Sequence, residues 1–111
     1  MTFPDDYETI AHIEWRYESW EYDQTEVYRR KDGALFYAED SGCSCPIPFE
    51  YTSEADLTPI RSLADWNRYA RGGLGDSDSP DLTRRDVQEA TATIRKYLAA
   101  PTTPTNEENN A

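Results

Sequence analysis

The sequence predicts an α+β fold, in which a small antiparallel β-sheet of about three strands in the N-terminal half is packed by two C-terminal helices. Three observations support this class. Apolar and polar residues alternate from Ile13 to Tyr17, which is typical of a half-buried strand. Two β-rich runs flank the short loop Lys31-Asp32-Gly33, which is typical of a hairpin. Apolar residues recur at helical spacing over residues 84–99.

The first strand is expected to begin at Ile13, after an irregular lead-in over residues 1–12. Its alternation changes phase before Trp20 and Tyr22. That change indicates a bulge, a turn near Ser19, or a strand with aromatic side chains on both faces.

The hairpin joins the run Thr25–Arg30 to the run Ala34–Glu39. Gly33 would supply the positive φ that such a short loop needs. A lone hairpin is only marginally stable in water, so we expect the first strand, over Ile13–Tyr22, to pair with it in a meander over residues 13–39.

A loop rich in cysteine and proline follows over residues 40–50, where regular structure is disfavoured. The first helix is expected over about residues 59–71, because Thr58-Pro59 is typical of an N-cap followed by proline at the first helical position. Ser62 with Asp65 offers a second start for the same helix.

Gly72-Gly73 is expected to end the first helix. Thr83-Arg84-Arg85-Asp86 has the pattern of a capping box and precedes the second helix, expected over residues 84–99. Residues 101–111 contain no core-forming side chain, so we expect a disordered tail there. The length suits one domain, over residues 1–100.

The chain is strongly acidic, with 11 Lys and Arg against 22 Asp and Glu in 111 residues. Residues 1–56 hold 14 of these acids, only 4 of the bases and 11 of the aromatic residues. The charge argues against direct binding to nucleic acid, whose phosphates would repel it. No run approaches the roughly 20 apolar residues of a membrane span, and no signal peptide pattern is present, so we expect a cytoplasmic protein without a membrane partner.

The densest mixture of acids and large rings lies between Glu14 and Glu26. Aromatic rings anchor protein interfaces, and clustered carboxylates steer a basic partner toward them. The expected partner-binding residues are Glu14, Trp15, Glu18, Trp20, Glu21 and Asp23. The alternative is that strand alternation alone puts the rings in the core and the acids in water.

The two cysteines, Cys43 and Cys45, lie in the sequence Gly-Cys-Ser-Cys-Pro. In an extended loop the side chains at i and i+2 point the same way, so both are candidate zinc ligands. Zinc takes four ligands, and the others would have to come from elsewhere in the chain or from a second copy across a dimer. Otherwise the two thiols are reduced and structural, and the protein needs no cofactor.

The sequence lacks a catalytic constellation. The single histidine, His12, has no nucleophile at a diagnostic spacing, and residues 72–75 lack the Lys-Ser/Thr of a phosphate-binding loop. Neither G-x-S-x-G nor H-E-x-x-H occurs. We therefore expect a protein that is not an enzyme.

One pattern runs through the middle third of the chain: Trp20-Glu21-Tyr22-Asp23, Val27-Tyr28-Arg29, Leu35-Phe36-Tyr37-Ala38-Glu39-Asp40-Ser41-Gly42-Cys43-Ser44-Cys45-Pro46 and Pro48-Phe49-Glu50. In this pattern the chain resembles a small uncharacterised family of proteins encoded by bacteriophages of actinobacteria, for which no activity is assigned. The resemblance implies a protein made in the cytoplasm of the infected bacterial host.

Together these observations predict a non-enzymatic, acidic phage accessory protein that binds a host protein. In one version its carboxylates imitate phosphates and occupy the basic cleft of a nucleic-acid-binding protein. The alternative function is a small zinc-binding domain that uses Cys43 and Cys45.

Overall fold

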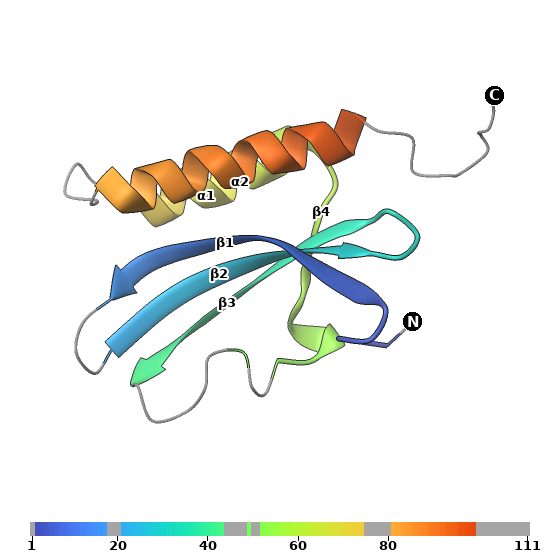
Figure 1. Cartoon of the computed structure of the whole chain (residues 1–111), viewed down its shortest axis with the longest axis horizontal. Helices are drawn as coiled ribbons and strands as arrows, with labels where there is room; N and C mark the ends of the chain where they lie inside the picture. The colour runs from blue at the N-terminus through green and yellow to red at the C-terminus, as the bar shows by residue number, and fades with distance from the viewer. Residues whose placement is uncertain (1, 18–20, 44–48, 50–51, 75–80, 100–111) are drawn as a thin grey trace.

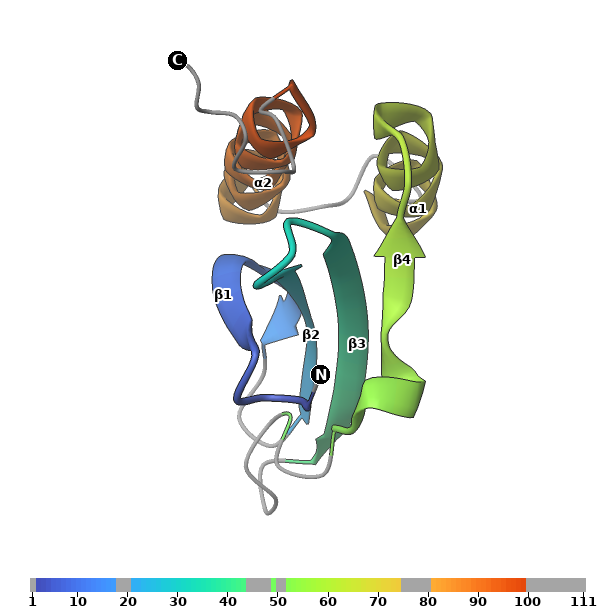
Figure 2. The ribbon, with the colours of Figure 1, turned by 90° about the vertical axis from the view of Figure 1, so that its right-hand side faces the viewer.

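The computed structural model of the chain describes residues 2–17, 21–43, 49, 52–74 and 81–99. In chain order the elements are β1 (Tyr7–Tyr17), β2 (Glu21–Arg30), β3 (Leu35–Cys43), the short 3₁₀ helix η1 (Glu54–Asp56), β4 (Thr58–Ile60), α1 (Leu63–Leu74) and α2 (Asp81–Ala99). The strands form one antiparallel sheet in the order β1-β2-β3-β4, and both helices lie on one side of it (Figures 1 and 2). The predicted α+β fold is confirmed, with a fourth short strand added to the meander.

The first strand begins earlier than predicted. β1 starts at Tyr7, so the expected irregular lead-in is wrong for residues 7–12. The register with β2 shifts between Thr9 and Ala11, which leaves Ile10 as an extra residue on β1. A bulge of this kind interrupts the alternation of apolar and polar residues, and the periodic signal of a strand is therefore missing from this part of the sequence.

A second register shift lies between Glu14 and Arg16, and leaves Trp15 without a direct partner on β2. One change of phase therefore lies inside β1, as a bulge. The expected first strand over Ile13–Tyr22 is wrong at its end, because β1 ends at Tyr17 and Tyr22 belongs to β2, where it pairs with Tyr17. Because a bulged residue is re-aimed relative to its neighbours, the direction of the Trp15 side chain depends on this irregularity.

The hairpin between β2 and β3 is confirmed. The Arg30 N–H donates to the Ala34 carbonyl over 2.8 Å, and Gly33 has the expected positive φ of 97°. β3 continues to Cys43 because residues 40–43 pair with the start of β2. The predicted loop over residues 40–50 is therefore wrong for its first four residues.

The start of the first helix corrects the prediction based on Thr58-Pro59. These residues belong to β4, which pairs with β3 through Leu35 and Ile60. Proline lacks an N–H and has a fixed φ, so it suits an edge strand as well as the first turn of a helix. α1 begins at Leu63, and the Ser62 Oγ accepts the Asp65 N–H over 3.2 Å, as the second predicted start requires.

Two further boundaries differ from the predictions. Gly72-Gly73 does not end α1, which continues to Leu74. α2 starts at Asp81, so Thr83 lies inside the helix and is not its N-cap. The Thr83 hydroxyl is buried and donates to the Glu14 carbonyl over 2.8 Å. The capping pattern was misleading because this threonine ties α2 to the edge of the sheet. The predicted tail lies outside the described residues.

The main core lies between the sheet and the two helices. Trp66 is its largest fully buried side chain, with 0% exposure. Its Nε1–H donates to the Thr91 hydroxyl over 2.9 Å, and that hydroxyl donates to the Val87 carbonyl over 2.7 Å. The buried residues around it are Ile13, Val27, Leu35, Ile60, Ala70, Val87, Ala90 and Ile94. No helix in the described ranges is long and apolar enough to cross a membrane.

Candidate functional site

The two faces of the sheet carry different chemistry. Ile13, Thr25 and Val27 are fully buried beneath the helices. Strand alternation turns the neighbouring residues Glu14 and Glu26 to the opposite face, which we call the open face because the helices do not cover it. Tyr22, Tyr28 and Ala38 on this face are nevertheless buried. Cross-strand pairing aligns two neighbouring rows on it: Glu14, Gln24 and Asp40 in one, and His12, Glu26 and Ala38 in the other.

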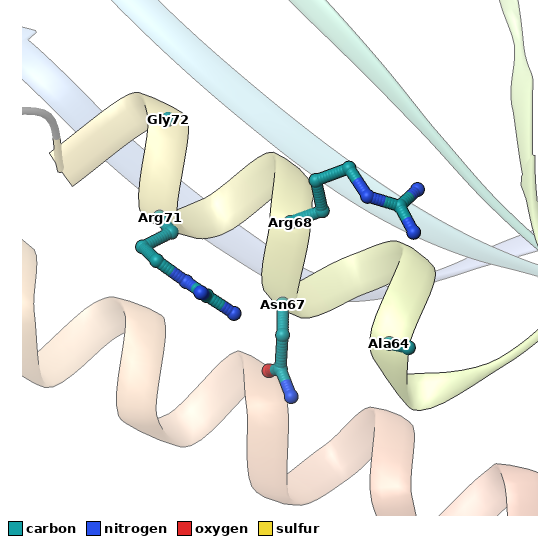
Figure 3. A pocket seen from close by; sticks show the side chains of 5 residues that line it. All are labelled: Ala64, Asn67, Arg68, Arg71 and Gly72. Atoms are coloured by element: carbon teal, nitrogen blue, oxygen red, sulfur yellow. The ribbon is translucent and has the colours of Figure 1, made fainter.

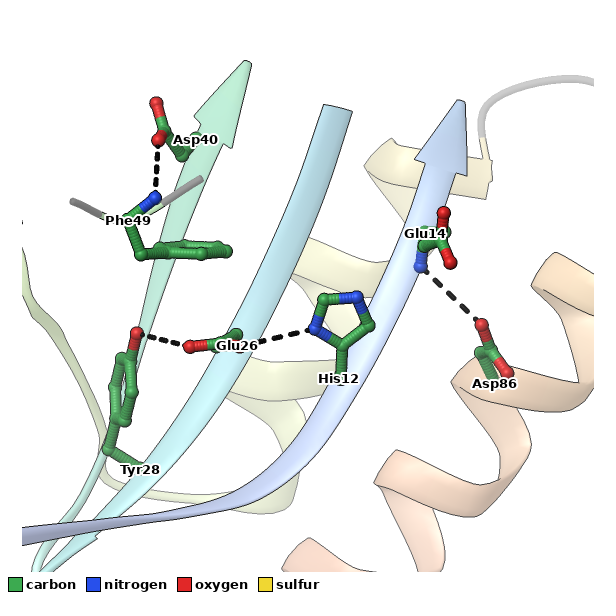
Figure 4. A network of polar contacts seen from close by, with 7 residues as sticks. All are labelled: His12, Glu14, Glu26, Tyr28, Asp40, Phe49 and Asp86. Atoms are coloured by element: carbon green, nitrogen blue, oxygen red, sulfur yellow. Dashed lines mark hydrogen bonds and ion pairs between the residues drawn. The ribbon is translucent and has the colours of Figure 1, made fainter. Parts of the chain in front are cut away.

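Glu26 lies at the centre of a polar chain on the open face (Figure 4). The Tyr28 hydroxyl donates to Glu26 Oε1 over 2.9 Å, and His12 Nδ1 lies 3.3 Å from Glu26 Oε2. The hydrogen bond with His12 is the main reason why the pKa of Glu26 is lowered. Both carboxylate oxygens are therefore held in place, and the side chain is fixed in orientation.

His12 is the exposed end of this chain, with 40% of its side chain accessible. Its pKa is raised, first by the hydrogen bond to Glu26 and further by the charges of Glu14 and Asp86. Asp86 belongs to α2 and accepts the Glu14 N–H over 3.4 Å. Glu26 therefore contacts the imidazole, and Glu14 at the edge of the sheet and Asp86 near the start of α2 act on it through their charge alone.

Asp40 continues the acidic character of the open face on β3. Its Oδ2 accepts the Phe49 N–H over 2.8 Å (Figure 4). The same oxygen accepts the Tyr22 hydroxyl over 3.4 Å. Both donors are neutral, so the negative charge of this carboxylate is not cancelled by them.

The face beneath the helices holds a second polar chain, which starts at Trp15. The indole N–H donates to the Thr25 hydroxyl over 2.7 Å. Tyr69 from α1 donates to Glu39 Oε1 over 3.2 Å. The Thr25 and Tyr69 oxygens are 2.5 Å apart, and the Tyr69 proton is already used, so Thr25 is the donor between them. The chain runs in one direction, from the indole to the carboxylate.

Two carboxyl groups meet at the end of this chain. The pKa of Glu39 is raised, first by burial and then by its hydrogen bond and charge interaction with Asp23. Asp23 Oδ1 is buried and has no hydrogen-bond partner among the described residues. Thr25 pairs with Glu39 and Asp23 pairs with Ser41, so the two acids are diagonal neighbours. Sequence reasoning missed this pair because one member is on β2 and the other on β3.

The structure separates the partner-binding residues predicted from the sequence. Glu14 lies on the open face, whereas Trp15 and Asp23 lie on the face beneath the helices. Of Glu21 only the backbone is described, and it pairs with Cys43. Glu18 and Trp20 lie outside the described residues. Strand pairing instead brings His12, Glu26 and Asp40 to the face of Glu14, and the sequence signal for them was the alternation along β2 and β3.

The predicted metal ligands are described only in part. Cys43 ends β3, and its backbone alone is described, while Cys45 lies outside the described residues. Within the described ranges, no three His, Cys, Asp or Glu side chains are grouped so that they could hold a metal ion.

Basic side chains gather on the helices instead. A hollow on α1 is lined by Ala64, Asn67, Arg68, Arg71 and Gly72 (Figure 3). Asn67 and Arg71 extend toward α2, and Arg68 extends on the other side of α1. Residues 57–100 hold 7 bases and 6 acids, against 4 bases and 14 acids in residues 1–56. The excess of negative charge therefore lies in residues 1–56.

Comparison with known families gives one match. The profile of a family described as a domain of unknown function, DUF7574, matches residues 3–104. This range includes every helix and strand described above. A search of curated proteins and a search of solved structures each found no match.

Proposed function

We propose that this chain, which belongs to the DUF7574 family, is a non-enzymatic protein that binds a basic partner through the open face of its sheet. The proposal rests on one observation: Glu14, Glu26 and Asp40 lie together on the face that the two helices leave uncovered. Carboxylates gathered on one face accelerate the encounter with a positively charged surface and disfavour negatively charged ones.

The partners of these carboxylates support the proposal. Arg30, Lys31 and Arg68 form ion pairs with Asp32, Asp6 and Asp65, respectively. The carboxylates of Glu26 and Asp40 are instead held by hydroxyl, backbone and imidazole groups. Glu26 is 23% exposed and pairs with His12, so the negative charge that it offers to a cation from outside the molecule depends on the protonation of His12.

The spacing of the carboxylates suits a rigid, repeated pattern of charge. Glu14, Glu26 and Asp40 come from three adjacent strands, which lie about 4.7–4.9 Å apart in a sheet. Because strands hold side chains more rigidly than loops do, little conformational entropy is lost when a partner binds.

In its finer form the proposal is that the chain is a bacteriophage accessory protein and that its partner is a host protein. A nucleic-acid-binding protein is the favoured class, because its basic cleft is complementary to a rigid array of negative charges. The carboxylates would then occupy sites where phosphates bind.

The test compares two triple variants that remove the same net charge. The open-face variant carries Glu14→Gln, Glu26→Gln and Asp40→Asn. The control carries Asp5→Asn, Glu8→Gln and Glu89→Gln, three exposed acids outside the two open-face rows. The probe is an N-acetylated, arginine-rich peptide without histidine, and its affinity is measured by fluorescence anisotropy at low and moderate salt.

We expect the open-face variant to lose about tenfold or more in affinity, together with much of the salt dependence, whereas the control stays close to wild type. Equal loss in both variants would mean that only net charge matters, and would overturn the proposed site. Circular dichroism and thermal melting confirm that each variant is folded. Capture from host lysate with the same pair of variants then tests whether a host protein uses the same face.

A further inference from the structure

We propose that His12 regulates the open face, so that binding of a basic partner weakens when the imidazole takes up a proton. This inference rests on the proposed function and adds to it a dependence on pH between about 5.5 and 7.5, where histidine is the residue that titrates most readily.

The placement of His12 is the first argument. It lies in the same cross-strand row as Glu26, and Figure 4 shows its ring between Glu26 and Glu14. The side chain is exposed, so a partner that approaches Glu14 or Glu26 must also approach the imidazole. Protonation therefore places a positive charge at the surface that is proposed to attract cations.

The ring is also fixed, which makes its charge act at a defined place. Glu26 Oε2 accepts the Nδ1–H of His12, and Glu26 Oε1 is already occupied by the Tyr28 hydroxyl. A neutral imidazole with its proton on Nδ1 keeps the same hydrogen bond. Uptake of a second proton therefore changes the charge of the cluster without requiring a rearrangement of the side chains.

The charged groups that face His12 come from each neighbouring element. Glu26 is on β2, Glu14 is on β1, and Asp86 is on α2. With a neutral imidazole these three carboxylates give a net charge of −3. With an imidazolium the net charge is −2. The imidazolium also repels an arriving guanidinium or ammonium group directly. At contact distances near the protein surface, a single charge of this kind changes an affinity by about three- to tenfold.

The rest of the chain makes the assignment to one residue direct. His12 is the single histidine of the sequence. Ordinary Asp and Glu side chains ionise below this pH range, and Cys, Tyr, Lys and Arg ionise above it. The α-amino group also titrates near this range, and the pKa of Glu39 is raised, but both groups are retained in His12→Gln. The part of the pH dependence that is lost in His12→Gln therefore reports on His12.

The experiment measures binding of the same N-acetylated, arginine-rich peptide at pH 5.5 and pH 7.5 at constant ionic strength. The wild type is compared with His12→Gln, which stays neutral and can still donate to Glu26, and with His12→Lys, which stays charged. We expect the wild type to bind about three- to tenfold more tightly at pH 7.5. His12→Gln should bind tightly at both values and His12→Lys weakly at both.

The outcomes separate this inference from the proposed function. If the peptide binds through the open-face carboxylates but with the same affinity at both pH values, the regulation by His12 is overturned and the binding site stands. A pH dependence that persists undiminished in His12→Gln overturns it equally. If the wild type does not bind the peptide at either pH, the proposed function fails and the regulation fails with it.

Discussion

The indole of Trp15 lies against Gly73, so closely that no side chain fits at position 73. A Cβ added to Gly73 would come within 2.7 Å of the indole Cη2, closer than side-chain carbons approach one another. The indole has little freedom to withdraw, because its N–H is held by the buried hydroxyl of Thr25. The bulge on β1 and the glycine on α1 therefore form one packing unit.

We expect Gly73→Ala to destabilise the protein, although alanine is the better helix former. The added methyl group must displace either the Trp15 ring or the end of α1, and overpacking of this kind costs about 1–3 kcal/mol. Urea denaturation followed by circular dichroism measures the change in the free energy of unfolding.

Gly72→Ala is the matched control. A Cβ at Gly72 meets no atom within 4 Å, and the residue is helical. The substitution should therefore stabilise the protein by up to about 0.5–1 kcal/mol through helix propensity alone. If the two variants change stability in the same direction and by similar amounts, the close contact between Trp15 and Gly73 is not the controlling factor.

Thr25→Val should destabilise the protein through lost hydrogen bonds at almost constant volume. The hydroxyl accepts from Trp15 and donates to Tyr69, and a buried polar group left without a partner costs about 1–3 kcal/mol. Thr9→Val, at an exposed position of β1, is the control and should change stability by less than about 0.5 kcal/mol. Chemical denaturation of the two variants side by side measures the difference, and a similar cost in both would contradict the proposed chain of hydrogen bonds.

The Glu39→Gln variant should gain stability relative to wild type as the pH rises. The folded protein raises the pKa of Glu39 through burial and the nearby Asp23. A carboxyl group with a raised pKa stabilises the fold fully below its pKa in the unfolded chain, which is about 4.5. This stabilisation is lost as the pH rises through the pKa of the folded protein. Glutamine carries no charge, so it avoids this loss.

The measurement is the difference in melting temperature between Glu39→Gln and wild type at pH 4 and at pH 7. We expect the melting temperature of the variant minus that of wild type to increase by about 1–3 °C from pH 4 to pH 7. A difference that is independent of pH would show that the folded protein does not raise the pKa of Glu39.

The pair formed by His12 and Glu26 should stabilise the fold most between about pH 4.5 and pH 6.5. Because the pKa of His12 is raised in the folded protein, its contribution to stability is complete below the pKa of the unfolded chain. That contribution is lost as the pH rises through the pKa of the folded protein. Because the pKa of Glu26 is lowered in the folded protein, its contribution to stability is complete above the pKa of the unfolded chain. That contribution is lost as the pH falls through the pKa of the folded protein. His12→Gln should therefore lower the melting temperature more at pH 5.5 than at pH 8.

The effect is small, because exposed ion pairs contribute about 0–1 kcal/mol. Thermal melts of His12→Gln and of Glu26→Gln should show the same pH profile, since either change removes the pair. Profiles that differ would assign the effect to other contacts of one partner.

The parts of the fold that were predictable are those encoded locally. The loop Lys31-Asp32-Gly33 fixes the direction of the chain over a few residues, and the apolar stripe of the second helix repeats within one element. The start of α1 was ambiguous because Thr58-Pro59 suits either a helix start or an edge strand. Pairing of Ile60 with Leu35, which lies far away in the sequence, decided between them.

The candidate site was less predictable because a strand's faces depend on register. The density of acids and rings in the first half of the chain directed attention to β1 and β2. The bulges at Ile10 and Trp15 break the alternation, so the sequence no longer assigns each residue to a face of the sheet.

By itself, the amino-acid sequence determined the class of fold, the hairpin, the second helix and the unequal distribution of charge, because each depends on nearby residues or on composition. Only the tertiary structure decided that Glu14 shares a surface with His12, Glu26 and Asp40 while Trp15 and Asp23 lie beneath the helices. The reason is physical: a single extra residue in a strand reverses the face of every side chain that follows, and only pairing with the neighbouring strand shows where that residue lies.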